Sequence, residues 1–250
     1  MAGPLSIDDR PSPNHNARAD GARPDIVVLH YTGMESAEAA VGRLVDPDSG
    51  VSAHYVLMQD GRVLRLVEEE RRAWHAGDSH WGGTDHVNSR SIGIEIVNRG
   101  HDFGYEPFPE PQMAALERLL GGLLERWSIP AERVVGHACV APGRKIDPGE
   151  KLDWRRLARG GLSIWVDGAR SSPLDQQPEA GRFQRAAARF GYGVPRSGRW
   201  DGETRDCWDA FLRRFRPAEV GVPPHVAGVK QLEEMARRWP VRLDAEVAGS

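Results

Sequence analysis

Three short β-branched runs, separated by segments of helical spacing, restrict the fold of this chain more than any other feature. They read "DIVVLHYT" (residues 25–32), "SIGIEIVN" (91–98) and "RVVGH" (133–137). In the second, Ile92, Ile94 and Ile96 share one face of the predicted strand, because side chains alternate along a strand. Between the last two, "PQMAALERLLGGLLERW" places leucines at helical spacing after a first-turn proline. Strands and helices that alternate in this way predict an α/β fold around one sheet.

Two further segments fit the same pattern. "SAEAAVGRLVDP" predicts a short helix that starts near Ser36 and ends before Pro47. "AHYVLMQDGRVLRLV" predicts two strands joined at Asp60-Gly61, since both positions tolerate positive φ.

A change of composition after Trp165 indicates more than one domain. Residues 1–24, rich in Pro, Asp and Asn, predict an extended N-terminal segment, and 25–166 form the α/β domain. "DGARSSPLDQQPEAG" indicates a linker at 167–181, because Pro, Ser and Gly dominate it. Residues 182–250 then predict a small helical domain.

The bulk composition excludes several classes of function. A net charge of −3 over 250 residues gives no concentrated basic surface, so we expect no nucleic-acid partner. No run approaches the roughly 20 apolar residues of a membrane span. The N-terminus lacks the pattern of a signal peptide, and the two cysteines, Cys139 and Cys207, lie far apart. We therefore predict a cytoplasmic protein without disulfides.

Two of the predicted strands end on a histidine, His30 and His137, and Asp147 follows ten residues after the second. Strand ends hold side chains rigidly at the solvent boundary, which is where functional groups are placed. Two imidazoles and one carboxylate are a known ligand set for catalytic zinc, with the fourth position left to water. The alternative for each histidine is a polar side chain satisfied at a strand end.

Three nearby residues suit the chemistry of such a site. Glu95 lies on the strand face opposite the isoleucines, where it can act as a general base toward water. Lys145 precedes Asp147 by two residues, so both side chains leave an extended loop on the same side, and its charge can stabilise an oxyanion. Cys139 is a rival zinc ligand, although a buried cysteine is ordinary packing.

Taken in order, the segments resemble zinc N-acetylmuramoyl-L-alanine amidases of the AmpD and AmiD type. The resemblance rests on "VVLHYTG", "SAHYVLMQDGRVLRLV", "AWHAGDSHWGG", "NSRSIGIEIVNRG", "VVGHACVAPGRKIDPG" and "DWRRLARGGLSIW", and it extends over residues 12–166. The later segment "FQRAAARFGYGVPRSGRWDGETRDCWDAFLRRFRP" resembles the three-helix peptidoglycan-binding domain of the longer members.

The resemblance implies a central mixed β-sheet flanked by helices and a reaction that hydrolyses the amide between N-acetylmuramic acid and L-alanine in peptidoglycan fragments. It implies zinc ligation by His30, His137 and Asp147, with Glu95 as general base and Lys145 stabilising the tetrahedral intermediate. Substrate contacts are expected from four residues of the matching segments: Trp74, His75, Asn98 and Arg99. Relatives with a cysteine ligand have it at the position of Asp147, which argues against Cys139.

Two other functions share part of this pattern. A non-catalytic peptidoglycan-recognition module would lack a zinc ligand, whereas His30, His137 and Asp147 are all present. An exported autolysin acting on intact wall would require an export signal. We therefore expect a cytoplasmic enzyme that trims recycled muropeptides, including those that end in 1,6-anhydro-N-acetylmuramic acid; this step rests on analogy. The oligomeric state is not predicted.

Overall fold

The computed structural model describes residues 5–171 and 176–241. The chain divides into two compact units. The described parts of the first unit are residues 5–77, 86–137 and 147–164, and those of the second are 78–85, 138–146, 165–171 and 176–241. Two internal loops, 78–85 and 138–146, thus group with the C-terminal helices and not with the segments that flank them in the sequence.

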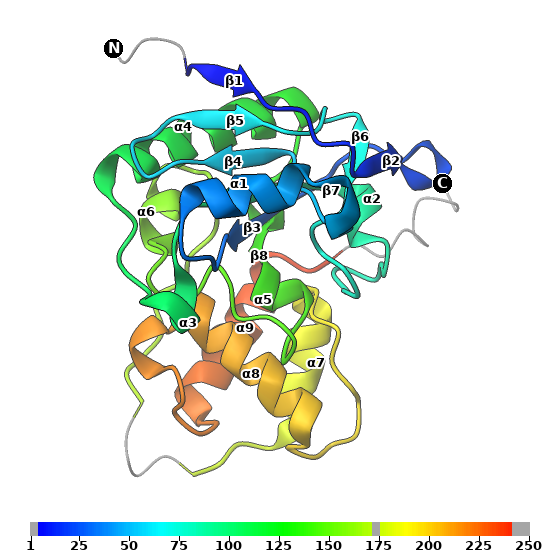
Figure 1. Ribbon diagram of the computed structural model, residues 1–250. Coiled ribbons are helices and arrows are strands. Elements are labelled where there is room, and N and C mark those ends of the chain that lie inside the picture. The colour runs from blue at the N-terminus through cyan, green and yellow to red at the C-terminus, as the bar shows by residue number, and fades with distance from the viewer. Residues whose placement is uncertain (1–4, 172–175, 242–250) are drawn as a thin grey trace. The chain divides into compact units, whose positions relative to one another are not determined.

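The first unit is built on a six-stranded sheet (Figure 1). Its order is β1 (Ile7–Asp9), β5 (Val63–Arg65), β4 (Tyr55–Leu57), β7 (Ser91–Ile96), β3 (Ile26–Tyr31) and β8 (Val134–Gly136). Strands β4, β7, β3 and β8 are parallel, β5 is antiparallel to β4, and β1 is parallel to β5. The sheet is therefore mixed, as the resemblance implied. A separate antiparallel pair joins β2 (His15–Ala17) and β6 (Arg71–Ala73).

Helices cover both faces of this sheet. In Figure 1, α1 (Ala37–Val45) lies in front of the strands and α4 (Glu110–Trp127) lies behind them. Three shorter helices complete the unit: α2 (Val87–Arg90), α3 (Gly100–Phe103) and α6 (Trp154–Arg159). Ser36 caps α1 and Asp153 caps α6, each accepting a hydrogen bond from a backbone N–H of the first turn.

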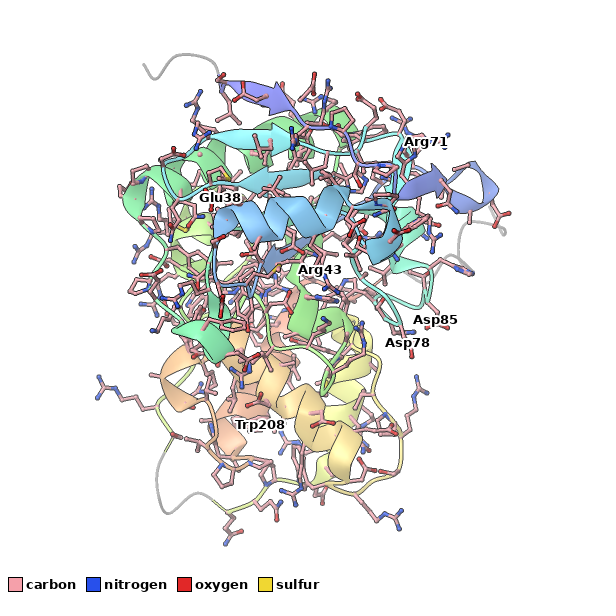
Figure 2. The ribbon with its side chains drawn as sticks, in the orientation of Figure 1. Glu38, Arg43, Arg71, Asp78, Asp85 and Trp208 are labelled. Carbon is pink, nitrogen blue, oxygen red and sulfur yellow. The ribbon has the colours of Figure 1, made fainter. Side chains whose placement is uncertain are left out.

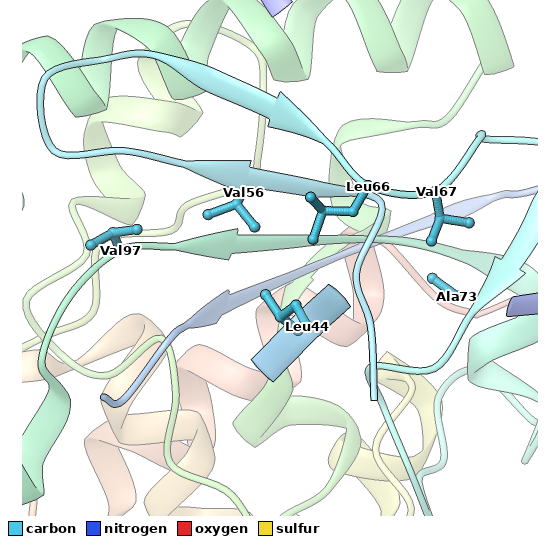
Figure 3. Packing of buried hydrophobic residues seen from close by; sticks show 6 residues of the cluster. All are labelled: Leu44, Val56, Leu66, Val67, Ala73 and Val97. Carbon is cyan, nitrogen blue, oxygen red and sulfur yellow. The ribbon is translucent and has the colours of Figure 1, made fainter. Parts of the chain in front are cut away.

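The face under α1 has a compact apolar core. Charged residues such as Glu38 and Arg43 are exposed on α1 (Figure 2), whereas Leu44 of the same helix is buried. Figure 3 shows Leu44 in one apolar cluster with Val56 of β4 and with Val97, which directly follows β7. Burial of such side chains stabilises the fold by roughly 1.5–3 kcal/mol each. The apolar side of α1 thus packs on the sheet, while its charged side faces solvent.

The other face carries Ile92, Ile94 and Ile96, all without solvent exposure. Side-chain alternation places them opposite Val56 and Val97, on the side of α4. The Gln112 amide of α4 donates to the carbonyl oxygens of Leu57 and Val97 at 3.0 and 2.9 Å. Helix α4 is therefore tied to the ends of two strands as well as packed on them. The hairpin predicted at Asp60-Gly61 joins β4 and β5, and Gly61 has a φ of 90°.

The N-terminal segment is joined to the rest of the first unit by strand pairing and hydrogen bonds. It contributes β1 and β2, and its polar side chains hydrogen-bond to the body of the first unit. The Ser12 hydroxyl donates to the Leu44 carbonyl at 2.5 Å, and the Asn14 amide donates to the carbonyls of Asp46 and Val51. Because these bonds depend on partners more than thirty residues away, composition alone could not predict them.

Arg18 makes the most extensive of these contacts. Its guanidinium is buried and donates to the carbonyl oxygens of Glu69, Ser89 and Ser91 at 2.7, 2.8 and 3.0 Å. Burial lowers the pKa of Arg18 to about 10, so the group is still charged at neutral pH. It ties the N-terminal segment to the start of β7.

Arg18→Met should destabilise the first unit by about 3 kcal/mol, because buried carbonyl oxygens lose their donor. For a chain of this size, that change lowers Tm by roughly 6–12 °C. Arg10→Met is the matched control, since Arg10 is exposed, and it should alter stability by less than about 0.5 kcal/mol. Thermal unfolding followed by circular dichroism checks both values. Equal melting temperatures for the two variants would contradict the role given to Arg18.

The second unit contains three longer helices, α7 (Ala180–Phe190), α8 (Gly202–Phe215) and α9 (Val226–Arg238), together with α5 (His137–Val140), which begins at the last residue of a first-unit segment. Aromatic residues fill its core, with Phe183, Phe190, Trp208, Phe211 and Phe215 all buried. Four 3-10 turns occur in the described chain, at Ala19–Gly21, Pro47–Ser49, Ala131–Arg133 and Pro217–Glu219. Across the described residues, the helices are too short or too polar to cross a membrane.

Candidate active site

The sheet topology brings the two histidines and Glu95 into one row. In the register of β3 and β7, His30 is paired with Glu95, so both side chains leave the same face of the sheet. On the other side, Leu29 is paired with Gly136, the last residue of β8, and the residues that follow them are His30 of β3 and His137, the first residue of α5. Three residues from distant parts of the sequence therefore lie at the same level of the sheet, two on adjacent strands and one directly after the third.

His30, His137 and Asp147 form a compact, buried cluster. The Nδ1 atoms of His30 and His137 are 2.9 Å apart, and they lie 3.1 and 3.0 Å from the same carboxylate oxygen of Asp147. Their exposed fractions are 1%, 3% and 7%. Among the described residues, this is the group of histidine, cysteine and acidic side chains whose geometry allows it to hold a metal ion.

The donor set fits zinc. Two imidazole nitrogens and one carboxylate oxygen are typical ligands of a catalytic site, and in tetrahedral zinc coordination such atoms lie about 3.3 Å apart. The three distances here are only slightly shorter. The residues present are therefore compatible with one zinc ion and an open fourth position.

The loop that carries Asp147 is fixed to Tyr105, which lies just after α3. Tyr105 donates its hydroxyl proton to the Pro148 carbonyl and accepts a hydrogen bond from the Lys151 N–H, both at 2.8 Å.

Burial alone would raise the pKa of Asp147, but the neighbouring His137 and His30 outweigh it and hold the pKa below its usual range. The carboxylate is therefore ionised, as a metal ligand must be.

A second layer of residues lies behind the histidines. His30 Nε2 is 3.0 Å from Nδ1 of His75, whose Nε2 is 3.2 Å from the Ser91 hydroxyl. His137 Nε2 is 3.1 Å from the Ala76 carbonyl. Burial is the main cause that lowers the pKa of His75 well below its ordinary value, so its ring is neutral. Spacing in the sequence gave no sign that His75 would contact the cluster or that Ser91 would lie behind His75.

Glu95 and Lys145 lie in different units of the chain. Glu95 is half-buried, with one carboxylate oxygen shielded from solvent, on the face that carries His30. Lys145 is half-buried in the loop 138–146, where its backbone N–H donates to the Ala141 carbonyl at 3.0 Å. That loop belongs to the second unit. The placement of Lys145 at the site therefore rests on its two-residue separation from Asp147.

The four residues expected to contact substrate have different surroundings. His75 and Asn98 are buried, and the Asn98 side chain is engaged by the Glu106 carbonyl and the Gly100 N–H. Trp74 is half-buried and donates its indole N–H to Asn16, while Arg99 is exposed. His75 and Asn98 thus make internal contacts, and their expected role in substrate binding stays a prediction. Trp74 and Arg99 remain predictions.

Cys139 has a packing environment in the second unit. Its side chain is 1% exposed, and the Tyr192 hydroxyl donates to its sulfur at 3.7 Å. It is not a member of the metal-compatible cluster found among the described residues. The geometry thus favours the interpretation of Cys139 as a core residue.

Cys139→Ser should keep the metal and most of the activity, because it alters packing around Tyr192 and leaves the cluster intact. A loss of stability of roughly 1 kcal/mol is expected for a polar atom placed in this core. Metal analysis and thermal unfolding of the purified variant test this. Loss of zinc from the variant would instead place Cys139 among the ligands.

Comparison with known proteins agrees with this geometry. Residues 20–150 match the family model of N-acetylmuramoyl-L-alanine amidase. The chain is 34% identical over 223 residues to N-acetylmuramoyl-L-alanine amidase AmiD of Escherichia coli strain K12, covering 80% of this chain and 78% of that protein. It is also 34% identical over 165 residues to the 1,6-anhydro-N-acetylmuramyl-L-alanine amidase AmpD of Salmonella typhimurium strain SL1344, with coverages of 59% and 86%.

A solved structure extends the similarity to the fold. The complex of E. coli AmiD with anhydro-N-acetylmuramic acid-L-Ala-D-γ-Glu-L-Lys superposes with a TM-score of 0.79 at 29% identity, covering 91% of this chain and 94% of that one. Together with the mixed sheet and the buried cluster, these similarities identify the chain as an amide hydrolase. More specifically, the chain belongs to the N-acetylmuramoyl-L-alanine amidase family and is of the AmpD/AmiD type.

Proposed function

We propose that the chain is a zinc-dependent enzyme that cleaves the amide between the lactyl group of N-acetylmuramic acid, including its 1,6-anhydro form, and the L-alanine of muropeptides. The observation that carries the proposal is the convergence of His30, His137 and Asp147 on one point beside the strand position of Glu95. The ligand of the AmiD complex and the name of the AmpD relative support the anhydro sugar as part of the substrate.

His30, His137 and Asp147 would hold the zinc ion. When bound, zinc supplies Lewis acidity, which activates water and polarises the scissile carbonyl. Glu95 lies on the same sheet face as His30 and would accept the proton released by the attacking water. The same carboxyl group can then return that proton to the departing nitrogen of L-alanine. Lys145, two residues from Asp147, would stabilise the negative charge that builds on the carbonyl oxygen.

The C-terminal residues 182–250 are proposed to bind peptidoglycan. Support comes from the three helices α7, α8 and α9 and from the extent of the similarity to AmiD, which covers 80% of this chain. Action on recycled fragments in the cytoplasm, rather than on intact wall, is the cellular role that the sequence predicts. Comparing digestion of a soluble muropeptide with digestion of intact sacculi distinguishes the two substrates, and cell fractionation tests the location.

Removal and return of zinc test the enzymatic proposal. Chelator-treated protein should lose hydrolysis of anhydro-N-acetylmuramic acid-L-Ala-D-γ-Glu-L-Lys, and about one equivalent of zinc should restore it, because one three-ligand site holds one ion. Chromatography of the released peptide gives the rate. Full activity of the protein after its metal has been removed would refute the proposal.

A further inference from the structure

We propose that His75 and Ala76 form a positioning element that fixes the ring tautomers of His30 and His137, so that both present Nδ1 to the metal. This inference rests on the proposed function, because it assumes that the cluster binds zinc. It assigns a role to residues outside the ligand set, and it begins from a chain of hydrogen bonds whose direction is fixed at one end.

The chain that reaches His30 starts at the Val87 carbonyl. The Ser91 hydroxyl donates its single proton to that carbonyl at 2.6 Å. Ser91 can therefore only accept from His75 Nε2, which lies 3.2 Å away and so carries the proton of the His75 ring. In the neutral ring Nδ1 then has a lone pair, and it accepts from His30 Nε2 at 3.0 Å.

The bond to His75 fixes the tautomer of His30. Because its Nε2 carries the proton, its Nδ1 has the lone pair, and Nδ1 is the atom that faces His137 and Asp147. The second histidine is fixed in the same sense by a shorter route. The Ala76 carbonyl can only accept, so His137 Nε2 donates to it and Nδ1 again has the lone pair. Two adjacent residues thus determine both tautomers.

The His75–Ala76 dipeptide is itself held in place. The Asn88 side-chain oxygen accepts from the backbone N–H groups of His75 and Ala76 at 3.1 and 2.8 Å. The His75 ring lies directly over Gly93 of β7, where a Cβ atom would come within 2.4 Å of the ring. Because Gly93 has no side chain, the His75 ring can lie directly on the sheet at this position.

Fixed tautomers should strengthen metal binding, because neither histidine has to exchange its ring proton before it can bind. Loss of a hydrogen-bond partner behind a metal ligand typically weakens metal affinity roughly 10- to 100-fold. His75→Phe keeps a ring over Gly93 and removes the acceptor for His30. We expect it to weaken zinc affinity by that factor, measured by competition with a chromogenic chelator. His75→Asn can supply an oxygen near the position of Nδ1 and should recover part of the loss.

His54→Phe is the matched control. His54 is fully buried and its ring lies 5.8 Å from that of His75, but its ring nitrogens lie within hydrogen-bond distance of Gly93, Arg18 and Arg71. This variant should lower the melting temperature and leave zinc affinity near that of the unaltered protein. Equal affinity losses in the two phenylalanine variants, or an asparagine variant as weak as His75→Phe, would show that packing matters and would overturn the proposal.

A spectroscopic measurement separates this inference from the proposed function. Long-range ¹⁵N–¹H spectra of the full chain should show the His75 proton on Nε2, whether or not zinc is added. If the unaltered protein binds no zinc, the proposed function fails, and the spectra still decide the hydrogen-bond chain. A His75 proton on Nδ1 would overturn the inference in either case. Should His75→Phe not fold, Ser91→Ala removes the acceptor at the end of the chain and should lower zinc affinity in the same direction.

Discussion

His137→Ala should lose zinc binding and amide hydrolysis together. The variant keeps only His30 and Asp147 of the three convergent groups, and a structural or catalytic zinc site needs at least three protein ligands. The loss of the imidazole also leaves the Asp147 carboxylate without one of the two histidines that hold its pKa low. We expect the metal content to fall from about one zinc per chain to background, with activity falling to background as well.

Elemental analysis and a muropeptide assay on the same preparation check this expectation. His15→Ala is the control, because His15 lies in β2 and its ring contacts Arg71. It should keep both zinc and activity. A His137→Ala protein with stoichiometric zinc would show that the ligand set is assigned wrongly.

Glu95→Gln should keep zinc and lose a hundred- to ten-thousand-fold in kcat, the typical contribution of a general base. The amide is nearly isosteric with the carboxylate but cannot accept a proton from water. Glu95 of β7 is paired with His30 of β3 in the sheet. Because the substitution replaces only a carboxylate oxygen of Glu95 by an amide nitrogen, it leaves the cluster and the strands intact. Because the proton transfer occurs in the transition state, KM should change far less than kcat.

Glu38→Gln provides the comparison, since Glu38 is an exposed residue on α1 (Figure 2). Its kinetics should equal those of the unaltered enzyme. Steady-state rates on a soluble muropeptide at saturating zinc measure both variants. Near-normal kcat for Glu95→Gln would show that another group takes the proton.

The elements of the α/β unit could be predicted from the sequence because each has a local signal. The isoleucine alternation in 91–98 identified β7, and the leucine stripe in 111–127 identified α4. The β-branched runs ending on His30 and His137 identified β3 and β8. The order of these strands in the sheet has no local signal, since it depends on packing between distant segments. The resemblance, not periodicity, supplied the expectation that the histidines meet.

Other features escaped prediction for the same physical reason. The polar residues of the N-terminal segment resemble a solvated linker in composition, yet Arg18 and Asn14 satisfy carbonyl oxygens of distant loops. The His75 ring lies on the sheet behind His30, in the space that Gly93 leaves, and the spacing of His75 in the sequence gave no sign of this contact. Such contacts depend on three-dimensional complementarity, which residue spacing does not encode.

The products formed in ¹⁸O-labelled water test the central claim most directly. The purified zinc-loaded protein would be incubated with anhydro-N-acetylmuramic acid-L-Ala-D-γ-Glu-L-Lys, and both products would be analysed by mass spectrometry. Hydrolysis at the lactyl amide predicts a peptide with an unlabelled, free L-alanine amine and a muramic acid fragment whose new carboxylate contains one ¹⁸O atom. An intact substrate, or a label found in the peptide at an internal amide, would contradict the account.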